Sequence, residues 1–222
     1  MTAVSTKGTV ISISDGDIAP TNLTVTAVVP ATTPDGPTLI TAANTAAAGD
    51  VVVFGSSTGF KALNNRAYPV IATGLSATQF NIVGADTYGS TETMSNSITA
   101  QLYKKVNNVN LCLSGFDIAA ATTNEVDTST YCADSSVLGK STPGSITLTG
   151  YGDKQDVGMK ELLRAESDGI PRLLTITLPG NLGWLIGVIS IGTLTWTVPL
   201  EGAVGYSANA SQNSVIKFVL AP

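Results

Sequence analysis

Residues 111–132 read LCLSGFDIAAATTNEVDTSTYC, and this stretch decides how the rest of the chain is interpreted. It opens with a short apolar run, a turn is predicted at Ser114-Gly115, and a Thr- and Ala-rich segment follows. The segment contains no Lys or Arg, and its charged side chains are Asp117, Glu125 and Asp127. Such a segment is expected to pack against another surface, with partners or water for its carboxylates. A surface loop of a β protein is the alternative, since polar Thr/Asn/Ala stretches are common in loops.

The order of short motifs around this stretch resembles the major tail tube protein of long-tailed, siphovirus-like bacteriophages. Gly115-Phe116-Asp117 comes first, NEVDTST follows at 124–130, and then Cys132. A strand at 144–151, a short helix with an acidic start and two long strands are predicted after them. In that family a Gly-Phe turn followed by Glu-hydrophobic-Asp-x-Thr-Thr precedes a β-sandwich that assembles into hexameric rings. The resemblance covers about half of the chain.

The resemblance implies a structural subunit of a viral tail, located in the virion tail and assembled in the cytoplasm of the bacterial host. Six copies would join their sheets into a ring with a β-barrel lumen, which removes exposed edge strands. Rings would stack head to tail and form the conduit for genome ejection. The implied partners are further copies of the chain, a tape-measure (ruler) protein, and tail terminator and tip proteins, while DNA would pass through transiently and non-specifically.

The ring and stack contacts are expected in segments 111–132 and 134–141, which we predict to be mobile loops. The residues concerned are Gly115, Phe116, Asp117, Glu125, Asp127, Thr128 and Ser135.

Composition and charge narrow the function classes. Only 12% of the residues are charged, against about a quarter in an average protein, which suits a subunit that buries much of its surface against copies of itself. The net charge of −5 argues against a nucleic-acid binder, which needs a basic patch, but is compatible with a duct for DNA. The longest apolar run, residues 182–200, is interrupted by Gly, Ser and Thr, so it predicts strands and no membrane span.

Catalysis, cofactors and metal binding are not expected. The chain has no His, which removes the commonest general base and triad member, and neither GxSxG nor SxxK occurs in a supporting context. Cys112 and Cys132 lack the close spacing and additional ligands of a zinc site. Because residues 1–8 are short and polar with no apolar signal segment, we expect both thiols to be reduced in the cytoplasm.

The predicted fold is mainly β, a tail-tube β-sandwich with one packed α-helix and a small all-β insert. The tube domain is expected at residues 1–19 and 106–222, and the insert at 20–105, where the composition shifts towards Thr, Ala and Pro. The insert resembles a small β-barrel module found in phage structural proteins and in ubiquitin-activating enzymes. Tyr68, Val70, Phe80 and Ile82 alternate and can share one core. A module with its own core is expected to be dispensable for ring assembly.

In the tube domain, strands are predicted at 8–14, 145–151, 171–178, 184–198 and 214–220 from period-two alternation. Gly187 and Gly192 are the expected bulges of the 184–198 strand. The predicted alternation places residues 186, 188, 194, 196 and 198 on one face of this strand and residues 189, 191, 193, 195 and 197 on the other. Threonine-rich faces suit a water-facing sheet, so the expected lumen-facing residues are Thr175, Thr177, Thr193 and Thr195.

The single predicted helix spans residues 153–167. Asp153 is the expected cap, Glu161 is placed on the solvated face, and Met159, Leu162 and Leu163 form the apolar stripe. Gly158 in its interior costs roughly 1 kcal/mol relative to Ala.

Two other function classes remain open. A head-decoration or baseplate protein would share the insert without polymerising into tubes, and a secreted β-sandwich adhesin would need a signal segment. Electron microscopy separates the first of these from a tube, because rings or hollow tubes favour the tube and persistent monomers or trimers do not.

Overall fold

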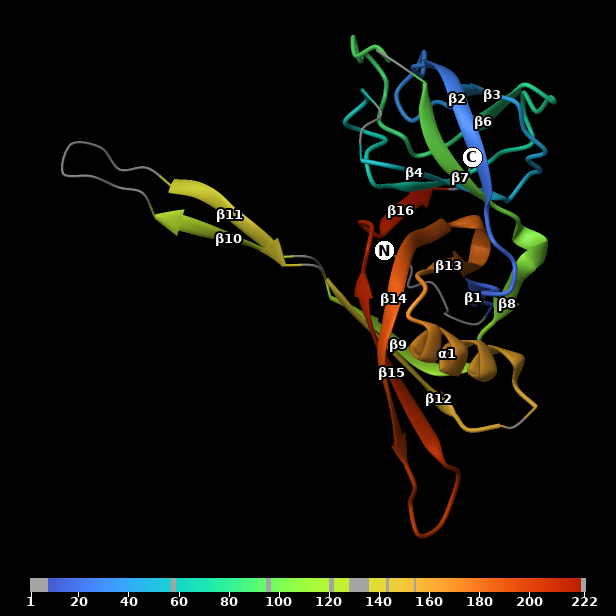
Figure 1. Cartoon of the computed structure of the whole chain (residues 1–222), viewed down its shortest axis with the longest axis vertical. Coiled ribbons are helices and arrows are strands. Elements are labelled where there is room, and N and C mark those ends of the chain that lie inside the picture. Colours follow the sequence, from blue (N-terminus) through green and yellow to red (C-terminus); the bar gives the residue numbers. More distant parts are fainter. Residues whose placement is uncertain are drawn as a thin grey trace.

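The computed structural model describes residues 8–56, 59–94, 97–119, 122–127, 136–142, 144–153 and 155–220. As the sequence predicts, the protein is mainly β, with 48% strand and 9% helix, and its strands pair antiparallel. Figure 1 shows the strands of residues 21–103 at one end of the molecule, a long sheet with one helix below them, and a hairpin that extends to the side.

The first sheet has six strands in the order β5-β4-β7-β2-β3-β6. Its strands are β2 (Thr21–Val29), β3 (Thr38–Ala42), β4 (Val51–Phe54), β5 (Ala67–Pro69), β6 (Gln79–Ile82) and β7 (Ile98–Tyr103). Tyr68, Val70, Phe80 and Ile82 are buried in one cluster, as their spacing predicts. Phe54, Phe60 and Leu63 complete this core, which belongs to the six-stranded sheet alone.

The second sheet has eight strands, in the order β8-β1-β13-β14-β15-β12-β9 with β16 paired to β14. Its strands are β1 (Val10–Ser14), β8 (Asn108–Asn110), β9 (Leu113–Ile118), β12 (Ser145–Tyr151), β13 (Arg172–Leu178), β14 (Gly183–Thr197), β15 (Gly205–Gln212) and β16 (Lys217–Leu220). Short 3-10 turns, η1 (Lys105–Asn107) and η2 (Pro179–Asn181), precede β8 and follow β13. Although β8 and β9 are consecutive in the chain, they lie at opposite ends of the strand order, so the sheet curls around its core.

Helix α1 (Val157–Asp168) packs inside this curl, where Met159, Leu162 and Ala165 join the core. The helix begins later than predicted, because Asp156 is the cap: its Oδ1 accepts from the backbone N of Gly158 at 2.8 Å. Gly158 is required by close packing, since a Cβ there would lie 2.5 Å from the carbonyl oxygen of Asn110.

The predicted faces of α1 are wrong for Glu161 and Leu163. Glu161 is buried, because its Oε1 accepts from Arg172 Nε at 2.7 Å and from the backbone N of Gly16 at 2.9 Å. Leu163 is exposed to solvent and does not join the apolar stripe. A buried carboxylate is tolerated here because a guanidinium from the neighbouring strand neutralises it.

Most of the described residues in the two predicted loop segments belong to strands instead. Ser114 and Gly115 lie within β9, where Gly115 pairs with Thr149 and accepts a hydrogen bond from its Oγ1 at 3.0 Å, so no turn occurs there. β10 (Thr122–Asp127) and β11 (Ser136–Thr142) pair with each other as a separate two-stranded sheet, the lateral hairpin of Figure 1. In both places backbone pairing with a neighbouring strand outweighs the weak local preference for loop.

β14 is one strand with one bulge. Its register shifts between Ile191 and Thr193, which confirms the bulge at Gly192, whereas Gly187 pairs regularly with Leu174 and is no bulge. The extra residue reverses the alternation, so Ile186 and Val188 lie on the opposite face from Leu194. The predicted grouping of residues 186 and 188 with 194 is therefore wrong.

The two sheets are packed against each other. Val51 and Ala67 of the first sheet form a buried cluster with Leu173, Ile186 and Val188 of the second. The chain returns from the first sheet to the second through Lys104 and Lys105, which follow β7. Buried Asp50 holds this segment, because its carboxylate accepts from the backbone N of Lys105 at 2.9 Å and lies 3.2 Å from Lys104 Nζ. The six-stranded sheet thus covers one part of a face of the eight-stranded sheet.

Candidate functional site

The part of that face left uncovered is a surface of small polar side chains. It lies on the C-terminal half of β14 and on β15, β12 and β9, whose alternate residues Leu194, Ala208 and Leu148 point into the core. We call it the polar face; its members are Thr193, Thr195, Thr197, Ser207, Asn209, Ser211, Ser145, Thr147, Thr149 and Asp117. The strand alternation of four consecutive neighbours therefore builds one continuous surface.

Hydrogen bonds hold several of these side chains against the sheet. Thr195 Oγ1 donates to the carbonyl oxygen of Ser207 at 3.2 Å, and Thr147 Oγ1 donates to Asn209 Oδ1 at 3.3 Å. Asp117 is the one ionisable member of the polar face, and none of its members is a Lys or Arg. The surface therefore offers hydroxyl and amide groups with almost no fixed charge.

Each side of this four-stranded region ends in an unpaired edge among the described residues. β9 pairs with β12 only, so its other edge is free. On β14, pairing with β13 stops at Ile189, and residues 190–197 have no strand on that side. The backbone N of Leu194 instead donates to Glu166 Oε1 at 2.8 Å. Exposed edges are sites where another chain can add a strand.

The expected lumen residues fall into two pairs. Thr193 and Thr195 are exposed on the polar face. Thr175 and Thr177 are half-buried on β13, on the side of the sheet that carries the buried Leu173. Thr175 Oγ1 is shielded from solvent and has no hydrogen-bond partner among the described residues.

The expected ring contacts are spread over two elements. Gly115, Phe116 and Asp117 lie on β9, at the free edge, and Phe116 is exposed on the face opposite Asp117. Glu125 and Asp127 belong to β10, while Thr128 and Ser135 lie outside the described residues, as does Cys132.

Sequence reasoning missed β15 and with it Ser207 and Asn209. Their strand alternates polar residues with Tyr206, Ala208 and Ala210, which are buried. Alanine gives a weak hydrophobic signal, so this alternation is easily overlooked.

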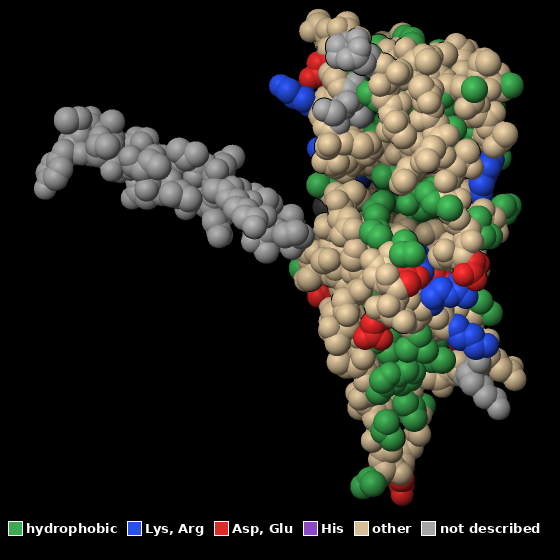
Figure 2. Space-filling model, in the orientation of Figure 1, with side chains coloured by type: hydrophobic (Ala, Val, Ile, Leu, Met, Phe, Trp, Pro, Cys, Tyr) green, Lys and Arg blue, Asp and Glu red, His purple; other side chains and the backbone are tan. Residues whose placement is uncertain are grey.

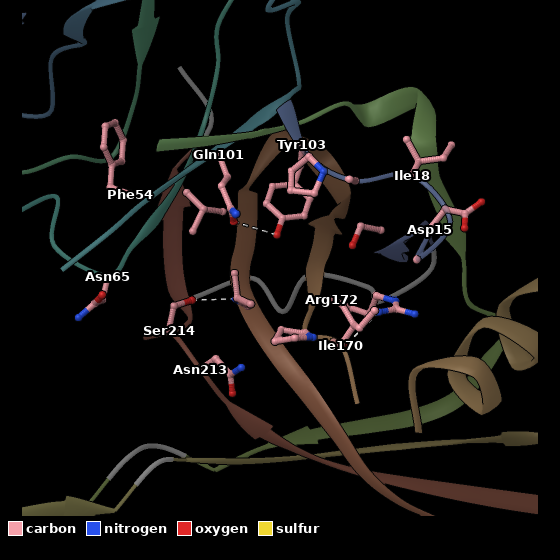
Figure 3. A pocket seen from close by; sticks show the side chains of 17 residues that line it. Asp15, Ile18, Phe54, Asn65, Gln101, Tyr103, Ile170, Arg172, Asn213 and Ser214 are labelled. Carbon is pink, nitrogen blue, oxygen red and sulfur yellow. Dashed lines mark hydrogen bonds between the residues drawn. The ribbon is translucent and has the colours of Figure 1, made fainter. Parts of the chain in front are cut away.

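A cavity of about 420 Å³ lies where the two sheets meet (Figure 3). Its most prominent charged group, Arg172, is fully engaged: besides Glu161, it donates to Asp168 Oδ2 at 2.7 Å and to the carbonyl oxygen of Ile170 at 2.8 Å. Tyr103, whose pKa is raised by burial, donates to Gln101 Oε1 at 3.4 Å, and Ser214 Oγ accepts from the backbone N of Val188 at 2.7 Å. Each of these hydrogen bonds stays within one sheet and its attached loops or helix, so these polar groups are already engaged inside the protein.

Within the described ranges, no three side chains among Asp, Glu and Cys gather closely enough to hold a metal ion. No helix in the same ranges is long and apolar enough to cross a membrane. A scan of protein-family models finds no match to this sequence, and a search of curated proteins finds no relative.

Proposed function

We propose that this protein is the structural subunit of a bacteriophage tail tube, which assembles into stacked hexameric rings that conduct the genome during ejection. The observation that carries the proposal is the four-stranded region β14-β15-β12-β9, which combines a nearly uncharged polar face with an edge on each side that has no strand partner among the described residues. On the β14 edge, Glu166 would have to release the backbone N of Leu194 for a strand to add there. The motif order around residues 111–132 supports the same function.

The strand directions favour ring closure. Because the four strands alternate in direction, β9 runs antiparallel to β14, so the β9 edge of one copy can continue onto the β14 edge of the next as an antiparallel ladder. Six copies, the number that the resemblance implies, would contribute about 24 strands spaced ~4.8 Å apart and tilted by about 40°. The barrel would be about 48 Å across between backbones, which leaves a channel wider than a DNA duplex after side chains are added.

The electrostatics of the polar face suit such a channel. A DNA duplex carries one negative charge for about every 1.7 Å of its axis, and a basic wall would bind it through counterion release. Hydroxyl groups with one scattered carboxylate per copy, that of Asp117, would repel the duplex weakly and make no specific contact. The wall would therefore let DNA slide.

In this function the partners are further copies of the chain, a tape-measure protein, and tail terminator and tip proteins. No cofactor, catalytic residue or membrane is involved. The protein would be assembled in the bacterial cytoplasm and would reside in the virion tail.

The first test combines electron microscopy with thiol labelling in a Cys112→Ser, Cys132→Ser background. Purified protein should form six-fold rings or hollow tubes, and persistent monomers or trimers would contradict the proposal. Thr195→Cys should then be protected in long tubes from a maleimide attached to a bulky polymer, whereas Lys160→Cys on the exposed side of α1 should react. Equal labelling of the two positions in tubes would show that the polar face lies outside.

A second test addresses DNA passage. Thr195→Lys in an assembling virion should leave tails intact while genome delivery becomes slower and more salt-dependent, because each copy adds a cation to the wall. Delivery that is unchanged at every salt concentration would mean that this face does not meet DNA.

A further inference from the structure

An uncovered apolar surface lies at the turn between β14 and β15. Trp196, Val198 and Leu200 are 44%, 74% and 106% exposed, and Glu201 follows them. Trp196 packs on one side against Tyr206, with ring centroids 5.9 Å apart, but its other side faces solvent. We call residues 196–201 the hairpin tip. Figure 2 shows apolar side chains that continue down to this end of the molecule, with an acidic group beside them.

A groove of about 470 Å³ lies at the other end of β14, between β16 and residues 83–88. Val83, Ala85 and Val219 form its buried apolar floor. Tyr88, Phe218 and Leu220 line it with exposed apolar surface. The groove is therefore concave, with an apolar floor and a lining that also carries Asp35, Asp86 and Lys217, whereas the hairpin tip is convex and apolar.

The groove also contains a cation, Lys217, that forms no ion pair among the described residues. Lys217 is half-buried, its Nζ donates to the carbonyl oxygen of Gly84 and lies 5.2 Å from the centre of the Tyr68 ring. Asp35 and Asp86 line the same groove, but neither forms an ion pair with Lys217 among the described residues. Burial lowers the pKa of Lys217, the charge of Arg66 lowers it further, and Asp86 offsets only part of this, so a further carboxylate brought in from outside would stabilise the ammonium group.

We infer that the hairpin tip of one copy binds the groove of a copy in the next ring, with Leu200 entering the groove and Glu201 lying beside Lys217. This inference rests on the proposed tube. Tip and groove are different surfaces, so the contact is heterologous, and because they lie at opposite ends of β14 it can repeat along the tube axis without closing, as a stack requires.

The spacing of the two surfaces sets the ring repeat. The groove adjoins Gly183–Ile186 through β16, and the tip follows Thr197, at the far end of the same strand. A rise of about 3.3 Å per residue places them roughly 46 Å apart along β14, which corresponds to about 35–45 Å along the tube axis for a strand tilted by up to about 40°. Image analysis of tubes should give a ring repeat within that range.

The first experiment disrupts the apolar part of the contact. Leu200→Asp should leave hexameric rings intact and raise the protein concentration needed for tube growth about ten- to a hundredfold, because a buried leucine is replaced by a charge. Val106→Asp is the matched control, since Val106 is also exposed but lies on η1, outside both surfaces. Tubes that form from Leu200→Asp at the wild-type concentration would overturn the inference.

The second experiment tests the pairing of the two surfaces directly. The double variant Glu201→Cys, Tyr88→Cys, in the Cys112→Ser, Cys132→Ser background, should give a ladder of disulfide-linked multimers when assembled tubes are oxidised, and each single variant should not. Tubes without a ladder would overturn the inference and leave the tube function intact. Absence of rings and tubes from the wild-type chain would overturn the proposed function itself.

Discussion

Removal of the six-stranded sheet is the most informative perturbation of the fold. Residues 21–104 can be replaced by a short Gly/Ser linker, because Thr21 pairs with Leu102 and the two connections therefore lie side by side. From sequence alone we expect this deletion to leave rings intact. The contacts between the sheets change that expectation, because the deletion uncovers the buried side chains of Leu173, Ile186, Val188 and Val219.

The magnitude follows from the buried apolar surface. Each of these four side chains contributes about 1.5–3 kcal/mol when it is buried, so the deletion removes up to roughly 6–12 kcal/mol. A domain has a total stability of about 5–15 kcal/mol. The deletion variant should therefore aggregate, or melt at a much lower temperature than the intact chain.

A companion variant separates exposed apolar surface from other effects of the deletion. Leu173→Thr, Ile186→Thr and Val188→Thr, added to the deletion, keep β-strand preference while removing most of the uncovered apolar surface. We expect this variant to be soluble and folded by size-exclusion chromatography and circular dichroism, and able to form rings in electron micrographs. A deletion variant without these changes that is soluble and melts like the intact chain would refute the reasoning.

Three further predictions concern α1 and its ion pairs. Gly158→Ala should lower the melting temperature despite the higher helix propensity of Ala, because its Cβ would meet the carbonyl oxygen of Asn110; a rise would contradict the packing. Arg172→Met should cost up to about 3–5 kcal/mol in urea denaturation because it leaves the buried Glu161 with the exposed Arg164 as its remaining charge partner, and adding Glu161→Leu should recover much of that loss. The hydrogen bond from the Arg172 guanidinium lowers the pKa of Asp168 below its ordinary 3.8. The ionised Asp168 therefore stabilises the folded state fully above about pH 4, and this stabilisation is lost as the pH falls through the folded-state pKa. The stabilities of the wild type and Asp168→Asn, measured by urea denaturation, should therefore converge in acid, and a constant difference would exclude the effect.

Local patterns in the sequence predicted a large part of the fold. Strict alternation located β1, β12, β13 and most of β14, and placed the core residues of the six-stranded sheet. These predictions hold because a half-buried strand needs apolar residues at every second position, whatever its partner. Thr193 and Thr195 could be assigned to an exposed polar surface for the same reason.

Other features depended on contacts between residues far apart in the chain. β9 became a strand because β12 pairs with it, and Glu161 is buried because Arg172 on the next strand neutralises it. β15 could not be predicted because its inward-facing residues include small alanines, which give little hydrophobic signal. These alanines are buried because the neighbouring strands β12 and β14 pair along both sides of β15.

The sequence by itself determined that the segments with strict apolar alternation, among them β1, β12, β13 and β14, are extended, and which of their residues are apolar. The tertiary structure decided which face of the eight-stranded sheet is covered, because the Gly192 bulge reverses the alternation along β14 and the six-stranded sheet packs on Ile186 and Val188. It also decided that Thr195 is exposed to solvent while the hydroxyl of Thr175 is shielded from it, although both are threonines in alternating strands. Alternation is a property of a few neighbouring residues, whereas coverage depends on which distant surface packs there, and that is set by the summed contacts of the whole chain.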